Sequence, residues 1–495
     1  MTTYPDGADP AENLGTEEVR DRAAAGAGVL GMRSALVYAL GIVANIALAR
    51  LLTPRDFGVV ALGSVLLVVG VQLTGAGMAG GLIRREEPPE PLELEAVMGL
   101  QLALATALAV IAAAAALTLG RDGLVVAVML ASLPIAAARL PATVVLERQL
   151  LYRPIALVDL AEAISYYVWA LAAVALGFGV WGLASAVVAR SVIGVLTMAR
   201  LGPLGFVRPR WSWPHVRGIV RFGAKIQAGA VVVIVRDQGL NVGLTAVAGV
   251  ATLGVWSLAY RILQVPVLIV MVAVRVSFPL MSRTLAARED PAPVIERSVA
   301  TMTVALAVVL VGLVGCAPAA LPALLGEAWR DVPAALLWSA LGLLISAPVM
   351  IGTIGYLYAT DHAGAVVTAI VLQTIVWFAV TLPTIPALGA VAVGVGSVPA
   401  GAVLAATAGR RAARLTGAAI LRNLALPAAL GIAAGAAGWA LAASGPDTLL
   451  AGAAGAAVGE LLLLAGLAVA SRPLLAQTYA VAARAFRQSL PGGAG

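Results

Sequence analysis

The sequence predicts an all-α polytopic membrane protein with about 14 transmembrane helices. Three observations predict this class. Hydrophobic residues occupy 61% of the 495 positions, charged residues occupy only 12%, and the mean hydropathy is +0.98. Soluble domains carry about 25% charged residues, and disordered chains need low hydrophobicity. We expect two pseudo-symmetric six-helix bundles around a central cavity, followed by two C-terminal helices.

Fourteen apolar runs, separated by charged residues, prolines or glycines, supply these helices. A helix needs about 20 apolar residues to cross a bilayer. The least distinct boundary lies between the eleventh and twelfth runs, which only Pro383, Pro386 and Gly389 separate. In chain order, the runs cover residues 29–49, 57–82, 95–118, 123–146, 154–176, 178–200, 218–246, 253–281, 298–322, 333–357, 363–383, 386–407, 418–443 and 448–470.

The distribution of basic residues predicts the orientation of these spans. If the N-terminus is cytoplasmic, and basic residues near the inner ends of the runs are counted with the adjoining loops, the inner loops and tails hold 22 Lys and Arg residues, the outer loops hold 4, and six lie inside spans. Cytoplasmic loops of membrane proteins carry such an excess. Arginine supplies 31 of the 32 basic residues, which is typical of a GC-rich bacterial genome. We therefore expect a bacterial cytoplasmic-membrane protein with both termini in the cytoplasm.

Changes in polarity along the chain predict its divisions. The break that contains Trp211 and Trp213 is expected to lie at the inner membrane surface, with tryptophans among the lipid headgroups. The expected divisions are a disordered cytoplasmic tail at 1–28, an N-terminal six-helix lobe at 29–202, a cytoplasmic linker at 203–217, a C-terminal six-helix lobe at 218–409, helices thirteen and fourteen at 410–472, and an amphipathic cytoplasmic tail at 473–495.

Glycine corners recur at matching places in the two halves. Gly58 and Gly254, 196 residues apart, each open an even-numbered helix on the outer side. Gly179, between the fifth and sixth runs, corresponds to Gly389, between the eleventh and twelfth. Because six helices separate the paired corners, the repeat keeps its orientation, as in transporters built from two parallel bundles. Chance similarity among glycine-rich corners is the alternative.

Ionisable residues inside the predicted spans are the candidates for function. Such groups are costly in a membrane unless they are paired or hydrated. The basic ones exceed the acidic ones by 6 − 4 = 2, and a surplus of buried cations needs an anion, which a phosphate or diphosphate would supply. The basic residues inside the predicted spans are Arg33, Arg139, Arg190, Arg236, Arg261 and Arg275, and the acidic residues are Asp159, Glu162, Asp237 and Glu460.

Some of these charges are expected to pair with each other. Asp159 and Glu162 lie three residues apart in the fifth run, and Arg139 and Arg190 lie in the neighbouring fourth and sixth runs. We expect structural ion pairs among these four. Arg33 lies near the inner end of the first run, where it either contacts substrate or extends toward the headgroups.

The eighth run carries the most informative pattern. Ser257, Arg261, Gln264 and Arg275 lie on one stripe of a helix that covers most of the bilayer depth. A polar stripe of that length should not face lipid, so it lines either a helix-packing seam or a water-filled cavity.

The first and seventh runs supply further candidates. Arg236 and Asp237 are adjacent near mid-depth, and adjacent helical positions point about 100° apart, so we expect them to have different partners. Tyr38 and Asn45 share one face of the first run, beside Arg33.

No catalytic, metal or cofactor site is predicted. The single Cys316 excludes a disulfide framework, and two histidines cannot form a His-rich metal site. The G-x-G-x-x-G pattern at 75–80 follows an apolar helix and not a strand, so close helix packing explains it. The net charge of +7 does not predict nucleic-acid binding, because aromatic residues make up only 5% and the arginines are scattered.

Several segments resemble, in order, those of bacterial polysaccharide transporters. Together they span roughly residues 29–410. They are ARLLTPRDFG at 49–58 (first outer loop), LERQLLYR at 146–153 (loop between helices four and five), GVWSLAYRILQVP at 254–266 and FPLMSR at 278–283 (helix eight and its end), and GEAW at 326–329 (loop before helix ten).

The chain thus resembles the polysaccharide transport branch of the multidrug/oligosaccharidyl-lipid/polysaccharide (MOP) exporter superfamily, which includes the O-antigen and lipid II flippases. The resemblance implies a flippase that moves an undecaprenyl-diphosphate-linked saccharide to the outer leaflet by alternating access, with polymerase or glycosyltransferase machinery as a further partner. It implies that cavity arginines hold the diphosphate. The candidates are Arg261, Arg236, Arg275 and Arg33, with Gln264, Asn45 and Tyr38 as hydrogen-bonding groups and Asp237 as a coupling or gating carboxylate.

The resemblance has limits, and other functions remain open. It departs at Arg236, where a neutral polar residue is expected, and it covers helices thirteen and fourteen poorly. A multidrug or cation exporter of the same superfamily is the first alternative, although a cation would require acidic residues that the first, second and eighth runs lack. A membrane glycosyltransferase or polymerase would need a larger outer loop than this chain has, and a non-transporting scaffold is the last alternative.

Overall fold

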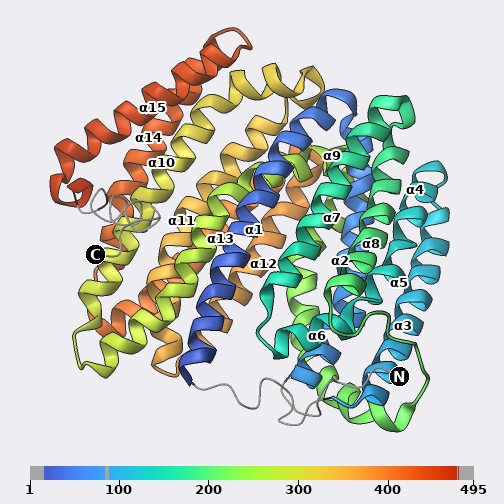
Figure 1. Ribbon diagram of the computed structural model, residues 1–495. Helices are drawn as coiled ribbons and strands as arrows, with labels where there is room; N and C mark the ends of the chain where they lie inside the picture. Colours follow the sequence, from blue (N-terminus) through green and yellow to red (C-terminus); the bar gives the residue numbers. More distant parts are fainter. Residues whose placement is uncertain (1–15, 84–88, 477, 479–495) are drawn as a thin grey trace, which may run out of the picture. The chain divides into compact units, whose positions relative to one another are not determined.

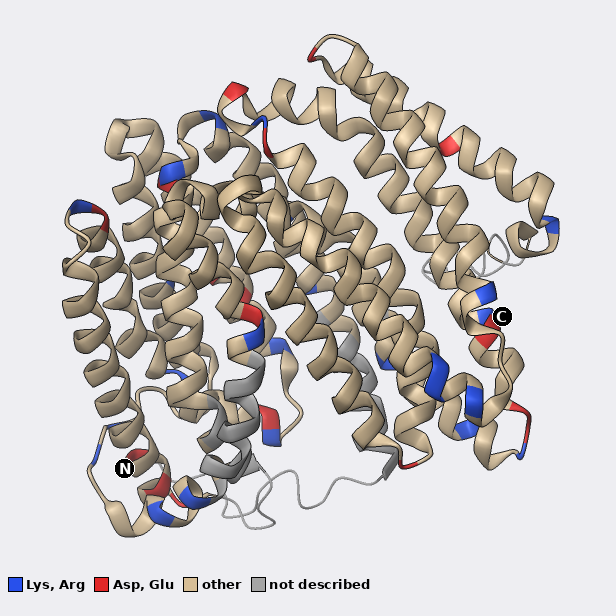
Figure 2. Cartoon of the chain, turned by 180° about the vertical axis from the view of Figure 1, so that it is seen from behind, with Lys and Arg blue, Asp and Glu red and all other residues tan. Residues whose placement is uncertain are grey.

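The computed structural model describes residues 16–83, 89–476 and 478, and all regular secondary structure within these residues is helical (Figure 1). Among them, 12 helices are long and apolar enough to cross a membrane, or up to 13 if one bent pair counts as a span. Charged residues gather at helix ends and in loops, with long uncharged stretches between them (Figure 2). The predicted class is confirmed, but the predicted number of fourteen spans is not.

The chain divides into two compact units, Met1–Thr245 and Ala246–Gly495. Helix α9 (Trp213–Ala286) contributes to both units. The first unit also contains α1 (Thr16–Leu51), α2 (Pro54–Ile83), α3 (Pro91–Leu117), α4 (Arg121–Leu130), α5 (Ser132–Ala137), α6 (Leu140–Arg148), α7 (Tyr152–Ala173), the π-helical turn η1 (Val174–Phe178) and α8 (Val180–Leu201).

The predicted N-terminal tail is partly helical in the structure, and parts of both predicted tails lie outside the described residues. Helix α1 begins at Thr16, so residues 16–28 are helical where the sequence predicts disorder. Ala, Glu and Arg dominate this stretch, and all three are strong helix formers. Residues 1–15 of the predicted N-terminal tail, and 477 and 479–495 of the predicted amphipathic tail, lie outside the described residues.

The fourth predicted span is broken into three short helices, α4, α5 and α6. The combined helix Arg121–Ala137 and the helix Leu140–Arg148 meet at an angle of 45°. Two prolines account for the breaks, because proline lacks the N–H that continues a helix. Pro134 lies within α5, and Pro141 lies in the first turn of α6. The break leaves Arg139 at the turn between α5 and α6.

The α7–α8 hairpin and the α12–α13 hairpin turn in the same way. Gly179 has φ 54° and ψ −132°, and Gly389 has φ 52° and ψ −128°. These left-handed values favour glycine. In each hairpin a tryptophan indole donates a hydrogen bond to a group 16 residues further on: Trp169 to Ser185 Oγ at 3.1 Å, and Trp377 to the Val393 carbonyl at 3.0 Å. This agreement is what the sequence repeat predicts.

Helix α9 continues through two predicted spans. Its apolar part, Ile234–Ala286, has 53 residues, more than twice the length that one crossing requires. The helix is interrupted at Gly249, with φ 83° and ψ 173°, between the predicted runs 218–246 and 253–281. Gly249 therefore marks the break that the sequence predicts between these two runs.

The predicted linker is fixed to the first unit where it enters α9. The backbone N–H of Arg210 donates to the Glu95 carbonyl of α3 at 3.0 Å. A Cβ at Gly99 would lie 2.2 Å from the Arg210 carbonyl oxygen, so the linker backbone passes directly over α3. Val216 and Ile219 of α9 are buried in a core with residues of α2, α3 and α6. Trp211 and Phe206 of the same segment are exposed.

The second unit contains the remaining helices, which are α10 (Pro291–Leu325), the short η2 (Glu327–Trp329), α11 (Val332–Ala359), α12 (Ala363–Leu388), α13 (Val391–Thr416), α14 (Ile420–Ser444) and α15 (Leu449–Ala470). Helices α10, α14 and α15 pack side by side (Figure 1). Pro383 and Pro386, which the sequence places between two spans, lie inside α12.

Three glycines bring α10, α14 and α15 into close contact. A Cβ at Gly455 of α15 would lie 2.5 Å from the Gly315 carbonyl oxygen of α10 and 2.6 Å from the Gly438 carbonyl oxygen of α14. A Cβ at Gly438 would lie 2.5 Å from the Gly455 carbonyl oxygen. Small residues allow membrane helices to approach backbone to backbone. The contact attaches the two C-terminal helices to α10.

Candidate functional site

A network of charged side chains joins four parts of the first unit. It contains Arg33 of α1, Arg139 at the α5–α6 turn, Asp159 and Glu162 of α7, and Arg190 of α8. Arg139 Nη1 lies 2.5 Å from Glu162 Oε1 and 3.6 Å from Asp159 Oδ1. The predicted structural ion pairs among Arg139, Arg190, Asp159 and Glu162 are therefore confirmed.

Glu162 is the buried centre of this network. Its side chain is 7% exposed, and its two oxygens accept hydrogen bonds from Arg139 Nη1 and, at 3.2 Å, from Arg190 Nε. On the α8 side it lies against Gly194, where a Cβ would be 1.9 Å from Oε1. Two cations thus compensate for burial of this carboxylate, and Gly194 leaves the space in which it lies.

Arg33 joins the network through Asp159. The two side chains form an ion pair between α1 and α7, and Arg33 Nη2 also donates to Ser34 Oγ at 3.2 Å. Arg33 Nε is buried and has no hydrogen-bond partner among the described groups. The sequence did not predict this pair, and contact between Arg33 and a substrate stays a prediction.

Arg236 and Asp237 pair with each other. Arg236 Nε donates to Asp237 Oδ1 at 2.8 Å. The expectation that the two residues have different partners is therefore wrong, because a long guanidinium side chain can bend across the 100° between neighbouring positions. The Asp237 side chain is 47% exposed, so this carboxylate remains open to its surroundings.

The other candidates of α1 have different environments. Asn45 is 7% exposed, and its amide donates to the Gly41 carbonyl at 2.6 Å. Gly41 itself packs against Tyr167, whose hydroxyl oxygen would lie 2.7 Å from a Cβ at that position. Asn45 therefore lies one helical turn from a contact between α1 and α7. Tyr38 is half-buried.

The polar stripe of the eighth predicted run lies in the second unit, on α9 after Gly249. Arg261 and Gln264 are half-buried, and Arg275 is exposed. Ser257 Oγ donates to the Gly254 carbonyl at 2.9 Å within the helix. Between residues 250 and 281 the charged residues are Arg261 and Arg275, with no carboxylate in the same stretch. This part of α9 is therefore a purely cationic segment of a membrane-spanning helix.

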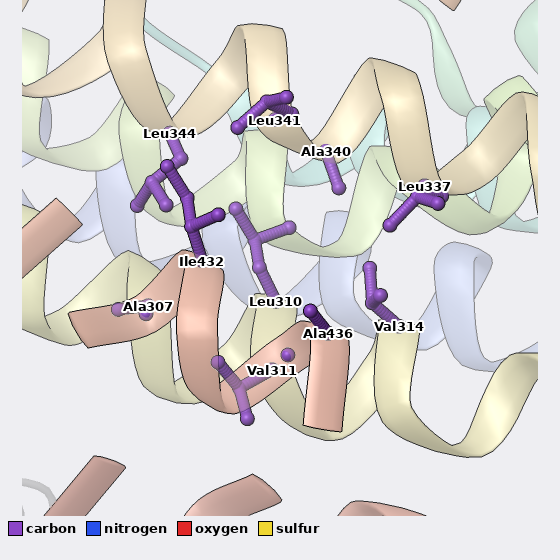
Figure 3. Close-up of a pocket in the computed structure, with 12 residues that line it drawn as sticks. Ala307, Leu310, Val311, Val314, Leu337, Ala340, Leu341, Leu344, Ile432 and Ala436 are labelled. Atoms are coloured by element: carbon purple, nitrogen blue, oxygen red, sulfur yellow. The ribbon is translucent and has the colours of Figure 1, made fainter. Parts of the chain in front are cut away.

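A cavity in the second unit has a different character. It lies between α10, α11 and α14, has a volume of about 100 Å³, and is lined by side chains that include Leu310, Leu341, Leu344 and Ile432. The labelled lining residues carry only carbon on their side chains (Figure 3). The cavity has no group that could bind an anion, and none of the predicted site residues lines it.

The sequence does not reveal the parts of the charge network that depend on tertiary contact. Gly194 carries no chemistry of its own, yet it makes the space that Glu162 occupies. The Arg33–Asp159 pair joins residues 126 positions apart. The surplus of cations inside the spans was the available signal, but it did not show which arginine meets which carboxylate.

The fold is shared with solved transporters of the MOP superfamily. The chain is similar to the lipid II flippase MurJ in an inward closed conformation, with a TM-score of 0.70 and 11% identity over 90% of this chain and 99% of that one. It is also similar to an inward-facing multidrug resistance MATE family transporter of the MOP superfamily, with a TM-score of 0.57 and 16% identity over 77% and 96% of the two chains. These similarities show that the chain has the fold of these solved transporters.

The family follows from the sequence. The family model described as polysaccharide biosynthesis protein matches residues 47–334, more than half of the chain, and the chain belongs to this family. It is 25% identical over 306 residues to the succinoglycan biosynthesis transport protein ExoT of Rhizobium meliloti (strain 1021), and the match covers 60% of each protein. The resemblance to polysaccharide transporters of the MOP superfamily is thereby confirmed.

Proposed function

We propose that this protein is a flippase that moves an undecaprenyl-diphosphate-linked saccharide from the inner to the outer leaflet of the bacterial cytoplasmic membrane, with both termini in the cytoplasm. The observation that carries the proposal is the cationic segment of α9, where Arg261 and Arg275 occur with no carboxylate over residues 250–281. The polysaccharide family and the flippase-like fold support it. The relatives are described as transporters or flippases, which supports a non-enzymatic role.

Arginine is suited to the diphosphate of such a substrate. Its guanidinium stays charged and forms two parallel hydrogen bonds to phosphate oxygens. Half-buried Arg261 stands beside Gln264, which is able to hydrogen-bond a phosphate or a sugar hydroxyl. Asp237, paired with Arg236, is the proposed coupling or gating carboxylate, and Tyr38 is a further hydrogen-bonding group.

The spacing along α9 gives the arginines successive roles. Arg261 and Arg275 are 14 residues apart, which corresponds to about 21 Å along a helix. One diphosphate is too short to meet both guanidiniums at once. In the proposed orientation Arg275 lies nearer the cytoplasm, so it meets the diphosphate first and Arg261 meets it deeper in the membrane.

A reconstituted assay tests this function. The purified protein is placed in liposomes that carry a fluorescent undecaprenyl-diphosphate saccharide, and exposure of the sugar to an external oxidising or lectin probe is followed. Protein-dependent exposure that is lost in Arg261→Ala supports the flippase and its site. Exposure that is unchanged in Arg261→Ala retains the function and removes Arg261 from the site. Efflux of a small cation without saccharide exposure would replace the proposal with cation export.

A further inference from the structure

The charge network of the first unit has a buried centre and partly exposed surroundings. At the centre, Glu162 is 7% exposed and pairs with both Arg139 and Arg190, beside the space that Gly194 leaves. Asp159 and Arg33 are 25% and 31% exposed. The Arg33–Asp159 pair is therefore partly open to its surroundings, unlike the Glu162 carboxylate.

Arg33 has hydrogen-bonding capacity that its present partners do not use. A guanidinium carries five N–H donors. Nη1 meets Asp159 and Nη2 meets Ser34, whereas Nε is buried and finds no acceptor among the described groups. A phosphate group, with several acceptor oxygens, would satisfy more of these donors than one carboxylate does.

Asp159 has a second cation within reach. Arg139 Nη1 lies 3.6 Å from Asp159 Oδ1, on the opposite carboxylate oxygen from the one that meets Arg33. A carboxylate inside a membrane protein is costly to leave unpaired. Because Arg139 is already adjacent, Arg33 could leave Asp159 without leaving that carboxylate alone.

We propose that Asp159 is a positioning residue that holds Arg33 until substrate arrives and then passes it to the diphosphate, while Arg139 takes over the pairing of Asp159. This inference rests on the proposed contact between Arg33 and the diphosphate. The Arg33–Asp159 pair is also a polar link between α1 and α7, so the exchange releases that link when substrate is bound. Asp159 and the diphosphate are thus competitors for one guanidinium.

Competition gives an unusual expectation for removal of Asp159. In the full-length protein, Asp159→Asn should bind inorganic pyrophosphate more tightly, by about tenfold, a typical size for coupling between two sites. Binding is measured by isothermal titration calorimetry, with thermal unfolding as the test of folding. Arg33→Gln should weaken binding, and the double variant should bind like Arg33→Gln alone. Tightening that persists in the double variant would overturn the exchange.

A second variant tests the exchange from the other side, and it also serves if Asp159→Asn does not fold. In Arg139→Gln, Asp159 loses its reserve cation, so it should hold Arg33 more firmly and pyrophosphate should bind more weakly than in the wild type. Unchanged or tighter binding in a folded Arg139→Gln would contradict the proposal, as would unchanged or weaker binding in a folded Asp159→Asn.

Failure of the proposed function has a separate signature. If wild-type protein exposes no saccharide in the liposome assay, the flippase function fails, whatever pyrophosphate does. If Arg33→Gln binds pyrophosphate as tightly as the wild type, Arg33 is not an anion contact. The proposed exchange is then refuted, and the proposed flippase function is not affected. Only a normal flippase with tighter binding in Asp159→Asn, abolished by Arg33→Gln, supports both.

Discussion

Gly194 of α8 leaves the space in which the Glu162 carboxylate of α7 lies, since a Cβ at position 194 would be 1.9 Å from Oε1. The glycine thus permits a buried anion to stand between Arg139 and Arg190. At this point the Glu162–Arg190 ion pair joins α7 to α8, and Gly194 allows the carboxylate to lie between the two helices.

Substitution of Gly194 by alanine should therefore destabilise the protein. The added methyl group forces Glu162 away from its partners, and overpacking of this kind costs about 1–3 kcal/mol. Thermal unfolding in detergent measures the change. Gly31→Ala is the matched control, because nothing lies within 4 Å of a Cβ there, and alanine favours a helix. Equal melting temperatures for the two variants would contradict this account of Gly194.

Removal of the buried carboxylate should cost more than removal of a surface one. Glu162→Ala leaves Arg139 and Arg190 without their shared partner, and breaking a buried pair costs about 3–5 kcal/mol, reduced here because Arg190 is half-exposed. Asp447→Ala breaks a 2.9 Å pair with Arg330, whose side chain is 59% exposed and also pairs with Glu327, so this change should affect stability little. Chemical denaturation of both variants compares these losses, and similar losses would refute the buried role of Glu162.

The attachment of α15 should depend on Gly455. A Cβ there would meet the Gly315 and Gly438 carbonyl oxygens at 2.5 and 2.6 Å, and backbone atoms cannot yield as a side chain can. Gly455→Ala should lower the melting temperature and increase protease cleavage of the α14–α15 loop at 445–448. Gly364→Ala, with open space around its Cβ, should do neither. Normal protease resistance in Gly455→Ala would show that α15 is attached elsewhere.

The substrate arginines should tolerate lysine poorly. Arg261→Lys keeps the charge but loses the two parallel hydrogen bonds to a phosphate, so saccharide exposure in liposomes should fall by about tenfold, and Arg261→Ala should abolish it. Arg275→Ala should slow uptake from the inner leaflet, since that guanidinium is expected to meet substrate first. Arg121→Ala, at the exposed first position of α4, should leave the rate unchanged. A fully active Arg261→Lys would show that charge alone is sufficient.

The sequence alone determined the membrane class, the approximate positions of the spans and the family. Those properties depend on local composition: runs of about 20 apolar residues, glycine at corners such as Gly179 and Gly389, and charges that lie mostly in loops. It also anticipated that Asp159 and Glu162 pair with Arg139 and Arg190, because neighbouring helices of one bundle pack together.

The tertiary structure decided which charged side chains form ion pairs. No local sequence pattern specifies these pairs. Pro134 and Pro141 break the fourth span and place Arg139 at a turn beside α7. Arg33 meets Asp159 because α1 packs on α7. Arg236 bends onto its neighbour Asp237, against the helical-wheel expectation. Pairing depends on the reach of side chains and on the space between packed helices, and only the folded chain fixes both.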